Sequence, residues 1–176
     1  MKTLKLIGLI LILSSSAESQ DLSKICREQM NVLSFMAGKW KGEATVTQQG
    51  GVTIQVAQEE NIEYKLDSLI LQLEGTGRRK DDLTKISFHA LAYLNYNASK
   101  KSFEMKSFLM DGKQTDAFFK VVEKNKYDWG FDVPGGKILY HITIDPVAKK
   151  WNEKGSFSPD GNQWYPFFEM NLTKQP

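Results

Sequence analysis

A regular alternation of apolar and polar residues runs through the chain from residue 40 onward. It is plainest in YDWGFDV (residues 127–133), where the aromatic and aliphatic residues fall on one parity and Asp128, Gly130 and Asp132 fall on the other. Alternate residues of a β-strand point to opposite sides, so each such segment offers one face to a core and one to water. The same pattern recurs at 52–56, 69–73, 86–94, 138–144 and 164–172. The chain beyond residue 40 is therefore predicted to be all-β.

Clusters of turn-forming residues separate these segments at short, regular intervals. They lie at 49–51, 67–68, 79–83, 98–101, 111–112, 124–126, 134–136, 146–149 and 159–161. Asp111-Gly112 predicts a two-residue hairpin turn, because this pair favours the positive φ angles that such a turn needs. The spacing predicts about ten antiparallel strands over residues 40–174. Ten strands can form a sandwich or a barrel, and we expect an up-and-down barrel because closure removes both exposed edges.

The N-terminal residues divide into an export signal and a helix. Lys2 and Lys5 precede an apolar run (residues 6–13) that is too short to span a bilayer, and small residues follow it. We expect residues 1–19 to be a signal peptide, and residues 20–176 to form one exported domain, periplasmic or secreted. Residues 21–37 carry an approximate apolar stripe, which predicts a helix that closes one end of the barrel.

Net charge and cysteine content restrict the kinds of partner and of covalent cross-link that we expect for this protein. Without residues 1–19 the net charge is +1, with both signs interspersed, which does not favour nucleic acid or stable membrane insertion. The single cysteine, Cys26, excludes an intrachain disulfide. Oligomeric state is left open by these features.

Several motifs in order resemble a known family. Gly38-Lys39-Trp40, after the helix and at the first strand, resembles the Gly-X-Trp signature of lipocalin-like (calycin) barrels. Together with residues 38–43, the segments 69–75, 151–161 and 164–170 resemble a family of uncharacterised secreted bacterial proteins with such a barrel. The resemblance implies that Trp40 packs across the closed end, with Gly38 permitting a tight entry and Gly42 leaving space beside the indole. It implies a fold, and no chemistry.

Small residues surrounded by aromatic ones on the inward parity predict a pocket for an apolar or amphipathic small molecule. We expect the pocket wall to comprise Phe88, Phe119, Trp129, Tyr140 and Trp151, with Glu60 and Glu153 as polar contacts and Gln58 beside them. Two alternatives stay open. The small residues can match large neighbours in a filled core, and a bulge at residues 58–61 can turn Gln58 and Glu60 to water.

Other functions have weaker sequence support. His89 and His141 fall on the outward parity, so we expect no cofactor or metal, with haem as a remote alternative. No nucleophile elbow or phosphate loop occurs, and Gly75-Thr76-Gly77 is interpreted as a turn. We expect no catalytic residues. The alternatives are an interaction module that uses the outward face of His89, Leu91, Tyr93 and Asn95, and an enzyme that uses an interior carboxylate.

Overall fold

The computed structural model describes residues 22–48 and 50–176. The expected signal peptide (residues 1–19) and Asp21 lie outside the described residues. Residues 22–30 are α-helical and continue into a 3₁₀ helix, η1 (Asn31–Met36), so the described helical part of the predicted 21–37 segment ends one residue early. Tightening to 3₁₀ geometry is common in the last turns of a helix.

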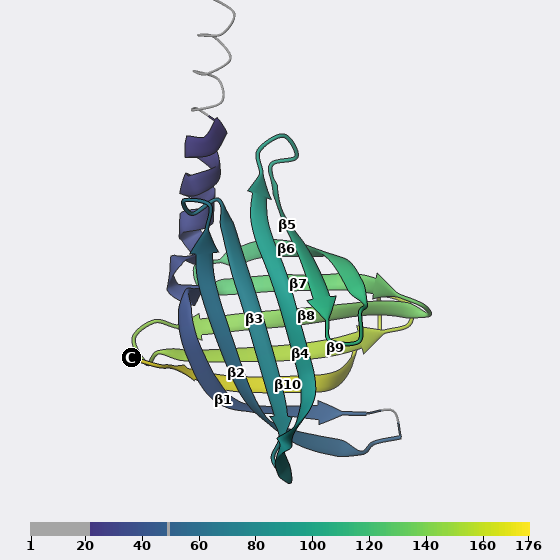
Figure 1. Cartoon of the computed structure of the whole chain (residues 1–176). Coiled ribbons are helices and arrows are strands. Elements are labelled where there is room, and N and C mark those ends of the chain that lie inside the picture. The colour runs from purple at the N-terminus through teal and green to yellow at the C-terminus, as the bar shows by residue number, and fades with distance from the viewer. Residues whose placement is uncertain (1–21, 49) are drawn as a thin grey trace, which may run out of the picture.

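Ten antiparallel strands form a closed barrel, as the sequence predicts (Figure 1). Each strand pairs with its neighbours in sequence, and β1 pairs with β10 to close the wall. The strands are β1 (Gly38–Thr47), β2 (Thr53–Lys65), β3 (Ile70–Arg79), β4 (Asp82–Asn97), β5 (Ser102–Leu109), β6 (Gln114–Glu123), β7 (Lys126–Val133), β8 (Gly136–Asp145), β9 (Lys150–Ser158) and β10 (Tyr165–Lys174). The fold is an up-and-down β-barrel with one N-terminal helix.

Two local predictions are wrong. The β5–β6 connection comprises residues 110–113, and the Leu109 amide donates a hydrogen bond to the Lys113 carbonyl at 2.8 Å. Three residues, 110–112, therefore form the loop inside this pair, and of them Gly112 alone has positive φ (+84°). A Gly at the third loop position suits a three-residue hairpin as well as Asp-Gly suits a two-residue one. Residues 75–77 do not form a turn. They lie inside β3, where Gly75 and Gly77 take the inward parity of Leu71 and Leu73.

The helix and one end of the barrel share a fully buried core. Met30, Leu33 and Met36 of the helical segment are 0% exposed and pack with Trp40 at the start of β1. The Trp40 indole Nε1 donates a hydrogen bond to the Met36 carbonyl at 2.8 Å, and its ring meets Trp151 edge-on at 5.5 Å. The Trp40 ring, whose N–H is hydrogen-bonded, therefore joins the helix to this end of the barrel. We call this end of the barrel the closed end, or the floor.

Gly38 and Gly42 allow residues of β10 to lie close to β1 at the closed end. Gly38 has φ +128°, a conformation that residues with a Cβ rarely adopt. A Cβ on Gly42 would lie 2.0 Å from the Asn171 carbonyl oxygen of β10. Gly42 thus gives room to the β10 backbone, where the barrel closes, and not to the indole of Trp40 as we expected.

The opposite end of the barrel is the mouth, formed by the hairpins that connect β1–β2, β3–β4, β5–β6, β7–β8 and β9–β10. Inward-facing side chains retain solvent exposure toward it: Phe88 is 42% exposed, and Trp129, Phe131 and Tyr140 are half-buried. Solvent therefore reaches inward-parity side chains at this end, whereas those at the closed end are fully buried.

Candidate ligand-binding site

Glu153, on β9, is the most buried carboxylate of the lumen, with 5% exposure. Two indoles hold it. Trp129 Nε1 donates to one carboxylate oxygen at 2.9 Å, and Trp151 Nε1 donates to the other at 3.2 Å. Burying a carboxyl group is costly unless its oxygens are hydrogen-bonded, and here each oxygen has a donor. The orientation of Glu153 is fixed by the wall itself.

Glu60, on β2, is the second lumen carboxylate. Gln58 Nε2 donates to its Oε1 at 2.8 Å, and no donor from the described residues bonds its Oε2. Gln58 is only 5% exposed, whereas Glu60 is half-buried, so solvent reaches the Glu60 residue. We refer to Gln58, Glu60, Trp129, Trp151 and Glu153 as the lumen cluster.

The inward direction of Gln58 and Glu60 follows from an unbroken register. β1 and β2 pair without a shift from Gly38↔Ile62 to Thr47↔Thr53. The alternative of a bulge at residues 58–61 is therefore wrong. Across the next strand pair, Gly75 faces Glu60 and Gly77 faces Gln58. A Cβ at Gly75 would lie 2.7 Å from the Glu60 carboxylate oxygens, so the glycine makes room for that group.

The burial of the two carboxyl groups changes their acidity. Burial raises the pKa of Glu60 to about 8; the hydrogen bond from Gln58 opposes this rise and the negative charge of Glu153 adds to it. Burial also raises the pKa of Glu153 to about 7, although both indole hydrogen bonds lower it. Desolvation dominates in both cases because it disfavours the charged form. Both carboxyl groups therefore titrate near neutral pH.

Aromatic rings form the wall beside Glu153. The rings of Trp129 and Tyr140 stack in parallel with centroids 4.1 Å apart, and Phe168 meets Tyr140 edge-on at 5.6 Å. A Cβ on Gly155 would lie 2.6 Å from the Tyr140 ring, so this glycine allows the ring to lie against β9. The arrangement places half-buried aromatic rings next to a carboxyl group on the mouth side of the barrel.

The remaining predicted wall residues lie apart from the lumen cluster. Phe88 faces inward near the mouth, opposite Gly77. Phe119 is 5% exposed and packs against Phe103 and Tyr127, toward the closed end. The structure thus groups five of the seven predicted ligand-binding residues, Glu60, Trp129, Tyr140, Trp151 and Glu153, and leaves two at its edges.

Both histidines face outward and pair with carboxylates. His89 Nε2 lies 3.0 Å from Glu74, and His141 Nδ1 lies 2.7 Å from Asp128. In residues 22–48 and 50–176, no three His, Cys, Asp or Glu side chains gather as a metal site. On the outward face of His89, Tyr93 is 36% exposed and meets Phe108 edge-on at 6.5 Å.

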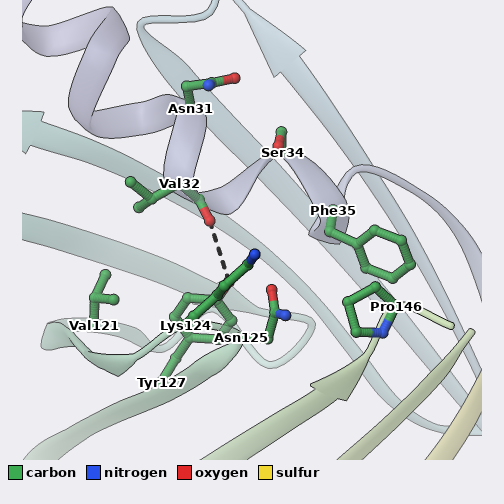
Figure 2. Close-up of a pocket in the computed structure, with 9 residues that line it drawn as sticks. All are labelled: Asn31, Val32, Ser34, Phe35, Val121, Lys124, Asn125, Tyr127 and Pro146. Atoms are coloured by element: carbon green, nitrogen blue, oxygen red, sulfur yellow. Dashed lines mark hydrogen bonds between the residues drawn. The ribbon is translucent and has the colours of Figure 1, made fainter.

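A cleft lies outside the closed end (Figure 2). It has a volume of about 520 Å³ and lies between η1, the β6–β7 turn and Pro146, with Phe35, Lys124 and Asn125 among its lining residues. The Tyr127 hydroxyl donates to the Val32 carbonyl at 3.2 Å at its base. None of the sequence-predicted site residues lines this cleft.

Sequence reasoning missed the polar role of two tryptophans and the space provided by Gly75 and Gly77. Trp129 and Glu153 lie on strands that do not pair with each other, because β8 lies between them. Their contact requires the curvature of the closed wall, which no local pattern encodes. The glycines had a usable signal: they continue the inward parity of Leu71 and Leu73.

Comparison with known proteins identifies the fold. No family model and no curated protein matches the chain. Among solved structures, Rv2717c from M. tuberculosis superposes with a TM-score of 0.62 at 12% identity, covering 84% of this chain and 97% of that one. The S-type phycobiliprotein lyase CPES from Guillardia theta superposes with a TM-score of 0.59 at 8% identity, covering 83% and 92%. The chain therefore has a lipocalin-like (calycin) fold.

Within the described residues, no helix is both long and apolar enough to span a bilayer.

Proposed function

We propose that this protein binds a small apolar or amphipathic molecule in the barrel lumen. The observation that carries the proposal is the asymmetry of burial among inward-facing side chains. At the closed end they are fully buried, whereas Phe88, Trp129 and Tyr140 toward the mouth remain accessible to solvent. Accessible aromatic surface beside a few fixed polar groups is the usual composition of a small-molecule site. The similar barrel of the S-type phycobiliprotein lyase CPES supports a ligand-binding use of the lumen.

In this proposal, Phe88, Phe119, Trp129, Tyr140 and Trp151 form the wall, and Glu60 and Glu153 are the polar contacts. Gly38, Trp40 and Gly42 serve the structure of the closed end. The protein acts without a bound cofactor or metal and recognises neither nucleic acid nor a membrane interior.

A neutral environment-sensitive dye, Nile red, tests this function by titration and competition. We expect saturable binding of one dye per barrel. Ala92 faces inward on β4 and is half-buried, so Ala92→Phe should fill the lumen and weaken binding at least tenfold. Leu91→Phe, one residue along on the outward face, is the matched control and should bind as wild type does. Unchanged dye binding in Ala92→Phe, with the fold checked by circular dichroism, contradicts a lumen site.

We also propose that the protein is exported and belongs with the secreted bacterial family that its motifs resemble. The basic start, the short apolar run and the small residues of segment 1–19 support this. N-terminal sequencing of the protein recovered from its own cells should begin near residue 18 or 20. Recovery of the intact chain from the cytoplasm would contradict export.

A further inference from the structure

We propose that the lumen selects an amphipathic cation, namely a protonated amine on an apolar body, and discriminates against carboxylates such as fatty acids. This inference rests on the proposed function, because it specifies the head group that the same lumen accepts.

The first argument is the sign of the charges inside the barrel. The charged groups that face one another in its middle are Glu60 from β2 and Glu153 from β9. The inward-parity base Lys174 lies at the closed end, where its Nζ donates to the Phe35 carbonyl at 2.8 Å and lies over the Phe35 and Trp40 rings. At the mouth, Arg79 is paired with Asp81. An anionic head group would therefore meet two carboxyls and no available base.

The second argument is hydrogen-bonding capacity. Both oxygens of Glu153 already accept an indole N–H. Glu60 accepts from Gln58 at one oxygen only, and among the described residues nothing donates to the other. No fully buried side-chain polar atom in the described chain lacks a partner, so this oxygen lies where solvent or a ligand reaches it. Glu60 can thus accept one further N–H from a bound molecule.

The third argument is the surface next to that oxygen. Trp129 and Tyr140 stack on one another beside Glu153 and are half-buried, so the part of each ring that solvent reaches can pack against an apolar body. Gly75 and Gly77 keep the strand beside Glu60 and Gln58 free of side chains. An amphipathic cation with its head group at Glu60 would therefore have a carboxylate partner, and aromatic rings would lie beside its apolar body.

Proton exchange should accompany binding. The groups that the structure places beside Glu60 are Gln58 on its own strand, Trp40 from β1, the glycines of β3, and Glu153 from β9. Of these, Glu153 titrates; Tyr140 lies near Glu153, and burial, with the charge of Glu153, raises the pKa of Tyr140 so far that it stays neutral. A cation favours the charged form of Glu60, so binding near pH 7 should release a proton.

The experiment compares three ligands with the same ten-carbon chain below their micelle concentrations: decylamine, decanol and decanoate. Each competes with Nile red, and calorimetry in buffers of different ionisation enthalpy counts released protons. We expect decylamine to bind at least tenfold more tightly than decanoate and more tightly than decanol, with proton release at pH 7. Decyltrimethylammonium, which cannot donate a hydrogen bond, should bind more weakly than decylamine.

Two variants test whether the preference for decylamine depends on the lumen cluster. Glu60→Gln should reduce the preference for decylamine over decanol at least fivefold and abolish most of the proton release. Glu59→Gln removes the adjacent outward carboxylate, which pairs with Lys41, and should behave as wild type. Equal binding of all three ligands, or an unchanged preference in Glu60→Gln, overturns the cation proposal while the lumen function stands. Absence of saturable binding for all of them overturns both.

Discussion

Glu60 lowers the stability of the folded protein when its carboxyl group is charged. A buried carboxyl group is tolerated best in its neutral form, because desolvation penalises the charge. In the unfolded chain a glutamate loses its proton near pH 4.5, whereas in the barrel Glu60 retains it up to about pH 8. Between these values the folded protein holds the additional proton. The free energy of unfolding should therefore fall as the pH rises through this interval.

The substitution Glu60→Gln tests this dependence, since the amide resembles the neutral acid and does not ionise. We expect equal stabilities of variant and wild type near pH 4. About 1.4 kcal/mol accompanies each unit of pKa shift, so the shift from 4.5 to about 8 corresponds to about 5 kcal/mol in full. Because Glu60 is only half-buried, solvent reduces this value, and at pH 9 the variant should be the more stable by on the order of 3 kcal/mol. Urea unfolding at pH 4, 6, 7.5 and 9 measures the difference.

Glu59→Gln is the control for this series, because Glu59 lies one residue away on the outward face and pairs with Lys41. A salt bridge on the surface contributes little to stability. The free energy of unfolding of Glu59→Gln should therefore stay within about 0.5 kcal/mol of the wild-type value at every pH. Parallel pH curves for Glu60→Gln and wild type would show that Glu60 does not carry a raised pKa.

At the scale of elements, the closure of the barrel depends on the contact between β1 and β10. Gly42 pairs with Leu172 of β10 and with Gln58 of β2, so it lies between two strands of the closing wall. Its position leaves no room for a Cβ beside the Asn171 carbonyl. The backbone must shift to accept any side chain there, and backbone shifts are more costly than side-chain rearrangements.

We therefore expect Gly42→Ala to destabilise the protein by about 3 kcal/mol and to raise amide hydrogen exchange first in β1 and β10. Chemical unfolding and exchange detected by mass spectrometry measure the two effects. Glu43→Ala, the next residue on the outward face of β1, serves as control and should cost no more than about 0.5 kcal/mol. Wild-type stability in Gly42→Ala would mean that the β1–β10 contact is looser than the structure shows.

The elements were predictable because the information that defines them is local. Period-two alternation and turn clusters place the strands, and an even succession of short hairpins favours closure. The register of β2 was not predictable, because a single-residue slip reverses the direction of Gln58 and Glu60 without changing the pattern. Gly75 and Gly77 were misread as a turn since glycine is uncommon inside strands, and here each faces a polar side chain from β2.

At the scale of the whole molecule, stability and accessibility are divided between the two ends of the barrel. The closed end combines the helical segment, the buried core residues and the indole of Trp40, whereas the mouth leaves aromatic side chains in contact with solvent. This division is consistent with a site that binds at one end while the other end holds the fold. It also implies that the same substitution should lower the free energy of unfolding more at the closed end than at the mouth.

Two tryptophans allow a matched comparison of this kind. Trp40 is 0% exposed at the floor, and Trp164 is 36% exposed at the mouth, just before β10. Trp40→Phe removes the donor to the Met36 carbonyl and leaves a void beside Trp151, so it should cost about 3 kcal/mol. Trp164→Phe should cost no more than about 0.5 kcal/mol. Thermal and urea unfolding of both variants measure the costs.

Ligand affinity should not follow stability if the floor serves structure alone. At a temperature where both variants remain folded, Trp40→Phe should bind Nile red within twofold of wild type, because the floor lies below the mouth side of the lumen. A large loss of affinity in Trp40→Phe, with the helix and strands intact by circular dichroism, would place the ligand against the floor. Equal losses of stability in the two variants would instead mean that the ends of the barrel are equally important to the fold.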